Sequence, residues 1–253
     1  MDMEALRQEV EKQVLAYFRM DPSVMDTGIT IRGTDVIATL EHSLLNPDTT
    51  LEKIQKECEV ARKYSVAAVC VAPYYVPAAY EILHNSPVIV GTAVGFPHGC
   101  MSQTAKIAEV KEAIANGAKE IDVALNNLAI KSGRLDVAQK ELEEIVCVAL
   151  GKAKIKAVFE HSLFTDEEKR KVLSMLPATG VEYVKIQNML SGHGARVEDV
   201  RLVKGLVGRH VRIKIDGGIK TLQQAEELLA AGADRLGLTA TAKIAEEAKQ
   251  HHE

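Results

Sequence analysis

Two short stretches, VEYVKI at residues 181–186 and VRIKID at residues 211–216, decide the fold. Each is a mostly apolar run with β-branched residues, which is typical of a strand buried in a parallel sheet. Each also carries a lysine near its end, Lys185 and Lys214. Amphipathic, helix-forming sequence separates the two runs. Strand, helix and strand in this order predict a βα unit of an α/β fold.

The same alternation extends over most of the 253 residues. The candidate strands are VIATLEHS from Val36, AAVCVA from Ala67, VIVGTAVGF from Val88, EIDVAL from Glu120, IKAVFEH from Ile155, VEYVKI from Val181, VRIKID from Val211 and RLGLTA from Arg235. Eight such units predict a single closed (β/α)8 TIM barrel. We expect the barrel to be the catalytic domain, over residues 36–253, preceded by an N-terminal helical extension over residues 1–35.

Composition excludes several classes of protein. The formal net charge is −4 and no basic stripe occurs, so neither a nucleic acid nor an anionic membrane is expected as a partner. No apolar run approaches the ~20 residues that span a bilayer. The four cysteines show no paired spacing, and the first residues lack the pattern of a signal peptide. We therefore expect a cytoplasmic protein with reduced thiols and no metal or redox cofactor.

Charged residues inside apolar strands are the candidates for chemistry, because barrel enzymes place reactive groups at the C-terminal ends of their strands. Side chains alternate along a strand, so Lys185, Lys214 and Asp122 are all expected to point into the barrel. Two ammonium groups on adjacent strands repel each other. One of the two lysines is therefore expected to lose its proton more easily.

A neutral lysine amine attacks a carbonyl to form a Schiff base, and Asp122 could move protons on and off the intermediates. The sequence thus favours a carbonyl-handling enzyme. The alternative is a buried ion-pair network with no chemistry. A second feature is Gly217 and Gly218, with Gly237 and Thr239 further on, at a position where barrels often bind phosphate. Plain tight turns explain these glycines equally well.

The chain resembles the deoxyribose-phosphate aldolases, which are class I aldolases that reversibly join acetaldehyde to glyceraldehyde 3-phosphate through a lysine imine. The resemblance runs from about residue 40 to residue 244. It rests on EHSLLNPDTT from Glu41, VCVAPYYV from Val69, VGFPHG from Val94, KEAIANGAKEID from Lys111, FTDEEK from Phe164, YVK ending at Lys185, RIKIDGGIKT from Arg212 and AGADRLG from Ala231. It implies Lys185 as the Schiff-base former, Lys214 as its partner, Asp122 as the proton relay and Cys70 as a lining residue, with no cofactor.

The chain departs from the family pattern at the distal end of the substrate pocket. Ile186-Gln187-Asn188-Met189 replaces a Thr-Ser-Thr-Gly run, and Asp216 replaces a serine. Thr239-Ala240 stands where the family has two serines, and Glu41 where it has aspartate. We expect a small aldehyde or sugar substrate, with or without phosphate. The candidate substrate-binding residues are Glu41, Cys70, Asn188, Asp216, Gly217, Gly218, Gly237 and Thr239.

Two rival functions remain open. The altered pocket is compatible with a non-catalytic sugar-binding or scaffold protein, since a fold alone does not establish an activity. A metal-dependent aldolase would use the repeated Glu-His-Ser-Leu at Glu41 and Glu160, but His42 and His161 have outward parity if the glutamates point inward. The sequence leaves a homo-oligomer open.

Overall fold

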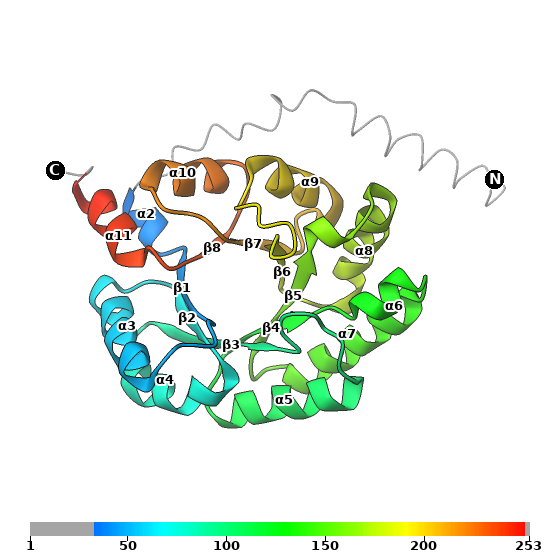
Figure 1. Cartoon of the computed structure of the whole chain (residues 1–253), viewed down its shortest axis with the longest axis horizontal. Helices are drawn as coiled ribbons and strands as arrows, with labels where there is room; N and C mark the ends of the chain where they lie inside the picture. Colours follow the sequence, from blue (N-terminus) through cyan, green and yellow to red (C-terminus); the bar gives the residue numbers. More distant parts are fainter. Residues whose placement is uncertain (1–32, 251–253) are drawn as a thin grey trace. The chain divides into compact units, whose positions relative to one another are not determined.

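The structure is a computed structural model that describes residues 33–250. Eight parallel strands pair in chain order, and β8 (Arg235–Leu238) pairs with β1 (Leu40–Leu44) to close the ring (Figure 1). The predicted TIM barrel is therefore confirmed. The expected N-terminal helical extension lies outside the described residues except for its last three positions.

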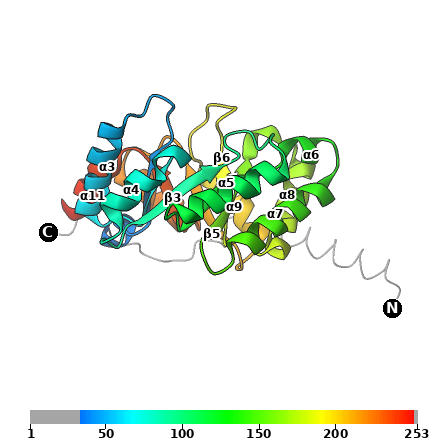
Figure 2. The same ribbon diagram turned by 90° about the horizontal axis from the view of Figure 1, so that it is seen from below.

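Every predicted strand after the first is present at its expected place. These strands are β2 (Ala68–Val71), β3 (Ile89–Val94), β4 (Glu120–Ala124), β5 (Lys154–Glu160), β6 (Tyr183–Gln187), β7 (Arg212–Asp216) and β8. The longer helices that surround them are α3 (Leu51–Tyr64), α4 (Val76–Leu83), α5 (Gln103–Ala115), α7 (Leu135–Ala149), α8 (Asp166–Thr179), α9 (Val197–Val207), α10 (Leu222–Ala230) and α11 (Thr241–Gln250). Figure 2 shows several of these helices along the outer wall of the ring.

Short helical turns complete the described chain: α2 (Gly33–Ile37), η2 (Pro73–Tyr75), α6 (Asn127–Lys131) and η3 (His161–Leu163). Helix α2 corrects one prediction, because the first strand was expected to start at Val36. Val36 and Ile37 are buried in α2 instead, and β1 starts at Leu40. A short apolar run satisfies burial in either structure, so its pattern does not separate helix from strand.

Helix ends follow the sequence signals closely. The Thr165 side chain accepts from the backbone N–H of Glu168, whose side chain accepts from the Thr165 N–H, a full capping box at the start of α8. The helix ends at Gly180, where φ is +81°, a value that favours glycine. Within residues 33–250, no helix combines the length and apolarity that crossing a bilayer requires.

The two faces of the barrel wall differ in chemistry. Outward-pointing strand residues such as Val184, Ile186 and Ile213 are fully buried beneath the helices. The inward positions between them carry many of the buried charged side chains of the protein. Alternation along each strand therefore places the apolar core between sheet and helices and gathers charge on the barrel axis.

Candidate active site

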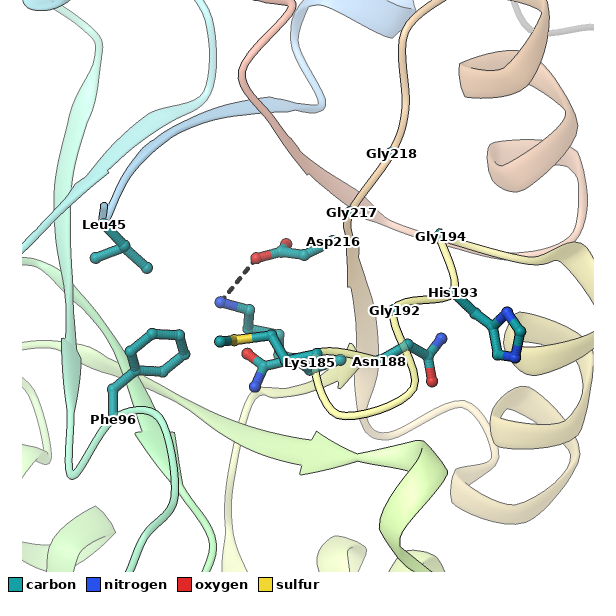
Figure 3. A pocket seen from close by; sticks show the side chains of 12 residues that line it. Leu45, Phe96, Lys185, Asn188, Gly192, His193, Gly194, Asp216, Gly217 and Gly218 are labelled. Carbon is teal, nitrogen blue, oxygen red and sulfur yellow. Dashed lines mark ion pairs between the residues drawn. The ribbon is translucent and has the colours of Figure 1, made fainter. Parts of the chain in front are cut away.

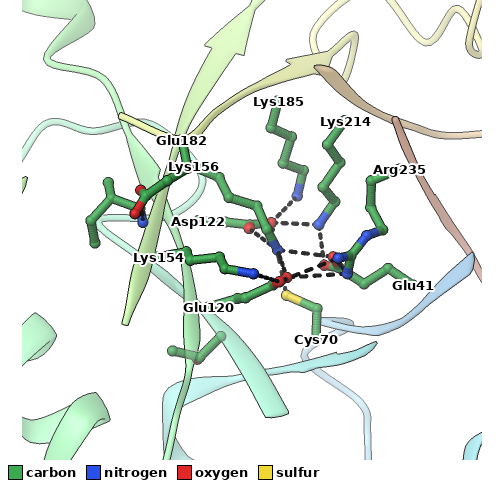
Figure 4. A network of polar contacts seen from close by, with 12 residues as sticks. Glu41, Cys70, Glu120, Asp122, Lys154, Lys156, Glu182, Lys185, Lys214 and Arg235 are labelled. Atoms are coloured by element: carbon green, nitrogen blue, oxygen red, sulfur yellow. Dashed lines mark hydrogen bonds and ion pairs between the residues drawn. The ribbon is translucent and has the colours of Figure 1, made fainter. Parts of the chain in front are cut away.

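The two lysines singled out from the sequence are direct neighbours in the sheet. Lys185 of β6 and Lys214 of β7 are register partners, and both are almost fully buried. Their side chains point into the barrel toward a shared set of carboxylates (Figure 4). The expected pair of inward ammonium groups at similar height is present.

The carboxylate of Asp122 on β4 joins the two lysines. Its Oδ2 lies 3.0 Å from the Nζ of Lys185 and accepts a 2.7 Å hydrogen bond from the Nζ of Lys214. Burial acts to raise the pKa of Asp122, but nearby ammonium groups hold that pKa well below its ordinary value. The three residues predicted to be catalytic therefore meet at one point, with Asp122 ionised.

A second carboxylate, Asp216 at the end of β7, contacts Lys185. Its Oδ2 lies 2.7 Å from the Nζ of Lys185 (Figure 3). The facing residue on β8 is Gly237, and a Cβ there would lie 1.8 Å from the Oδ1 of Asp216. Gly237, predicted to bind substrate, thus provides the space in which this carboxylate packs.

We call Asp122, Asp216, Lys185 and Lys214 the mouth cluster. Below it lies a second group of buried charges, the sealed cluster, formed by Glu41, Glu120, Lys156 and Arg235. The Nζ of Lys156 lies 2.9 Å from Glu41 and 2.7 Å from Glu120. Arg235 donates to Glu120 at 3.1 Å. Each charge in the sealed cluster therefore has an opposite charge within ion-pair distance.

The sealed cluster is connected to the mouth cluster. Glu41 accepts a hydrogen bond from Lys214, and the Nζ of Lys156 lies 3.2 Å from Asp122 Oδ1. Burial acts to raise the pKa of Glu41, but Lys156 and Lys214 lower it to about 2. Glu41, predicted to bind substrate, is fully buried in this network and is absent from the cavity lining described below.

Three members of the sealed cluster were not predicted from the sequence, namely Glu120, Lys156 and Arg235. A signal for Lys156 was present in the run IKAVFEH, where it is a charged residue two positions before Val158 and therefore on the same face. The parity argument that selected Lys185 would also have selected Lys156. Glu120 and Arg235 stand at the starts of their strands, where sequence alone does not tell a buried charge from an exposed one.

Lys214 was expected to lower the pKa of Lys185, but neighbouring carboxylates outweigh this effect. Burial and the charge of Lys214 both act to lower the pKa of Lys185, but Asp216 and Asp122 act in the opposite direction. The net result is a pKa raised above its ordinary value, contrary to the expectation from the lysine pair alone. Lys185 therefore rests as an ammonium ion and must pass a proton to a neighbouring group before it can attack a carbonyl.

A cavity of about 350 Å³ opens beside Lys185 (Figure 3). Its size falls within the usual range for small-molecule sites. It is lined by Leu45, Phe96, Lys185, Gln187, Asn188, Met189, Gly192, His193, Gly194, Asp216, Gly217 and Gly218. The nucleophile candidate is therefore accessible from a pocket, and of the predicted substrate-binding residues Asn188, Asp216, Gly217 and Gly218 face the same space.

Other predicted residues lie elsewhere. Cys70 is buried with its Sγ 3.9 Å from Asp122 Oδ2, and burial raises the pKa of its thiol. Thr239 lines a separate small pocket together with His42 and Lys53. Leu45, Phe96 and His193 also line the cavity but were not predicted to do so. They lie in loops, where no periodic pattern indicates which way a side chain points.

The histidines face away from the barrel axis, as their parity predicted. His42 lies 3.0 Å from Glu57 on α3, and His161 lies 3.4 Å from Asp199 on α9. Ligand atoms of Glu41, Cys70 and Asp122 come within 4.8 Å of one another. The ammonium group of Lys214 already bonds both of those carboxylates, so a metal cation placed there would meet a like charge.

Comparison with known proteins gives a consistent result. Residues 23–241 match the model of a family described as "DeoC/LacD family aldolase". The deoxyribose-phosphate aldolase of Clostridium tetani is 39% identical over 210 residues, which cover 83% of this chain and 97% of that protein. That of Staphylococcus carnosus is 40% identical over 210 residues, with 83% and 95% coverage.

Solved structures agree on the fold. A structure described as an aldolase superposes with a TM-score of 0.82 at 31% identity, and the match covers 86% of this chain and 97% of the other. A tetrameric deoxyribose phosphate aldolase from Aeropyrum pernix superposes with a TM-score of 0.82 at 22% identity, covering 92% and 99%. At that level of identity the second match shows the fold alone.

Proposed function

Because this chain belongs to the DeoC/LacD aldolase family, we propose that Lys185 is its imine-forming nucleophile and that Lys214 and Asp122 assist it. The activity is that of a class I aldolase, a lyase that makes and breaks a carbon–carbon bond. The observation that carries the residue assignment is that the Nζ of Lys185 borders the cavity and lies within 3.0 Å of Asp122.

Imine formation begins when Lys185 loses a proton to an adjacent carboxylate, Asp216 or Asp122. The neutral amine adds to the aldehyde carbon of the substrate and gives a carbinolamine. A proton delivered to the carbinolamine hydroxyl lets it leave as water, and a protonated imine remains. Asp122 is suited to this exchange because it lies within hydrogen-bond distance of the reacting nitrogen.

Carbon–carbon cleavage follows from the imine. A base removes the proton of the β-hydroxyl group, the bond between the α and β carbons breaks, and the electron pair flows to the iminium nitrogen as an enamine forms. The β carbon leaves as an aldehyde. Protonation of the enamine carbon and addition of water then release the second aldehyde and free Lys185. The positive charges of Lys156 and Lys214 keep Asp122 ionised, and the hydrogen bond from Lys214 fixes it between Lys185 and Lys214.

The proposed substrate is a 2-deoxyaldose, such as 2-deoxy-D-ribose 5-phosphate or a related sugar, cleaved to acetaldehyde and a second aldehyde. Support comes from the relatives, which are named deoxyribose-phosphate aldolases at about two-fifths identity over most of their length. These relatives do not favour a non-catalytic sugar-binding or scaffold role. The imine serves as electron sink, so the proposed route requires no metal ion.

Trapping tests this assignment. Incubation with acetaldehyde and borohydride should add the mass of the reduced adduct at Lys185. Lys185→Leu should abolish the adduct, whereas Lys220→Leu, which removes an exposed lysine outside the cavity, should leave it unchanged. An adduct of equal yield on Lys185→Leu protein would refute the nucleophile assignment. Loss of turnover with EDTA that zinc restores would instead indicate a metal-dependent aldolase.

A further inference from the structure

We propose that this cavity prefers an uncharged aldose over a phosphorylated one, and that Asp216 sets the preference. The inference rests on the proposed function and specifies the substrate class of the same cavity. It concerns selectivity at the distal end of the substrate, whereas the imine chemistry resides on Lys185.

The charges that line the cavity disfavour a phosphate. Among its lining residues, Lys185 and Asp216 are the fully charged side chains, and they pair with each other at 2.7 Å. His193 is the one other lining residue that can become cationic. Lys214, behind the lining, bonds Glu41 and Asp122. A phosphate dianion in the cavity would therefore meet a carboxylate and no unpaired lysine or arginine.

The lysines nearest in sequence to the usual phosphate-binding turns do not line the cavity. Lys220 and Lys243 are both exposed, and Lys243 lies 3.6 Å from Glu247 on its own helix. The turn glycines Gly217 and Gly218 do border the cavity. The backbone N–H of Gly217 donates to the carbonyl oxygen of Gly237 at 3.4 Å, so this donor points toward the sheet and away from a phosphate in the cavity.

The polar amides of the lining are also engaged by carboxylates. Gln187 donates its NH₂ group to Glu160 at 3.3 Å, and Asn188 donates to Asp199 at 2.9 Å. These carboxylates compete with any phosphate oxygen for the same donors, since phosphate only accepts at such contacts. A sugar hydroxyl can donate as well as accept, so it suits a lining rich in acceptors.

The position of Asp216 is built into the barrel. Its carboxylate fits only because Gly237 on the adjacent strand lacks a Cβ, and it forms ion pairs with two buried lysines, Lys185 and Lys214. Leu45, Phe96 and Met189 supply apolar surface to the rest of the cavity. Apolar walls with one fixed carboxylate suit a neutral carbon chain that bears hydroxyl groups.

The test compares kcat/KM for 2-deoxyribose and 2-deoxyribose 5-phosphate in the cleavage direction. We expect the wild-type protein to cleave the unphosphorylated sugar at least as efficiently as the phosphate. Asp216→Asn keeps the shape and removes the charge, and should raise the ratio of phosphate to sugar kcat/KM by about tenfold or more. Because both substrates react through the same lysine, this ratio cancels any change in imine formation.

Two further variants make the result specific. Asp216→Ser should change the ratio in the same direction as Asp216→Asn. Glu198→Gln removes an exposed carboxylate at the start of α9, outside the cavity lining, and should leave the ratio unchanged. A clear wild-type preference for the phosphate would overturn the inference. Asp216 variants that leave the ratio unchanged would also overturn it, and so would turnover of neither sugar. Trapping at Lys185 would still test the imine chemistry separately in either case.

Discussion

The mouth cluster and the sealed cluster contain the same kinds of charged groups but differ in their access to the cavity. Each contains two carboxylates and two cationic groups held inside the barrel, at Asp122, Asp216, Lys185 and Lys214 above and at Glu41, Glu120, Lys156 and Arg235 below. The difference is access. Lys185 and Asp216 border the cavity, whereas no member of the sealed cluster lines this cavity or the small pocket at Thr239. Buried ion pairs become reactive where a substrate can reach them.

Lys156 and Lys185 also differ in their surroundings. Lys156 contacts three carboxylates, whereas Lys185 contacts two, one of which belongs to the partly exposed side chain of Asp216. A buried charge that is enclosed by protein cannot be hydrated when its partner is removed, so the loss of that partner strongly destabilises the fold. A charge beside a cavity can be replaced by water or substrate. Loss of Lys185 should therefore mainly affect activity, and loss of Lys156 should mainly affect stability.

Lys185→Met should give the largest effect on activity. The change removes the proposed nucleophile, so kcat/KM should fall by at least about four orders of magnitude. Asp122 would keep Lys156 and Lys214, and Asp216 could be hydrated, so the free energy of unfolding should change by no more than about 1 kcal/mol. Steady-state kinetics and urea unfolding measure both. A large loss of stability would show that Lys185 is structural as well.

Lys156→Met should give the reverse result. Glu41 and Glu120 would each lose an ion-pair partner in a fully buried position, and removing one partner of such a group costs about 3–5 kcal/mol. Urea unfolding monitored by circular dichroism measures the loss. The reduced adduct should still form on Lys185 in whatever fraction remains folded. Unchanged stability would mean that the sealed cluster tolerates the loss of one buried cation, and the contrast between the clusters would fail.

The barrel could be predicted from the sequence because its strands are short apolar runs with a period of two and its helices carry clear caps. The inward lysine pair followed from the same parity. The start of the first strand could not be placed, since Val36 and Ile37 bury equally well in a helix. In so short a run, the pattern of apolar residues indicates which residues are buried but does not distinguish a helix from a strand.

The balance of charge around Lys185 was harder to predict than its position. Lys214 is a register partner and could be located from alignment of two strands. The contribution of Asp216 depends on a side-chain contact of 2.7 Å that Gly237 makes possible from another strand. The sign of a pKa shift depends on such distances, and no pattern in a single sequence supplies them.

Asp216→Asn should shift the pH dependence of imine formation by a moderate amount. Asp216 contributes to raising the pKa of Lys185, so its neutralisation should lower that pKa. Only the neutral amine reacts, and its fraction grows as the pH rises through the pKa. The rise of imine formation with pH should therefore move to lower pH, with a faster rate at neutral pH. Trapping rates with acetaldehyde across a pH series measure this, and a shift to higher pH would contradict the electrostatic account.

Lys154→Met should have the smallest effect, and it is the matched control for Lys156→Met. Both lysines belong to β5 and both approach Glu120, but the Lys154 side chain is 43% exposed and its Nζ lies 3.9 Å away. Glu120 would keep Lys156 and Arg235 as partners after the change. Because the Lys154 ammonium group is solvated and lies at the edge of ion-pair distance, we expect this contact to contribute less than about 1 kcal/mol.

Urea unfolding of the Lys154→Met protein should therefore fall within about 1 kcal/mol of wild type, and kcat/KM should be unchanged. The comparison isolates burial, because the residue type, the strand and the carboxylate partner are the same in both variants. If Lys154→Met destabilised the protein as much as Lys156→Met, the loss of any positive charge near Glu120 would explain both results. The sealed position of Lys156 would then have no special importance, and access to solvent would not be what distinguishes the two ends of the barrel interior.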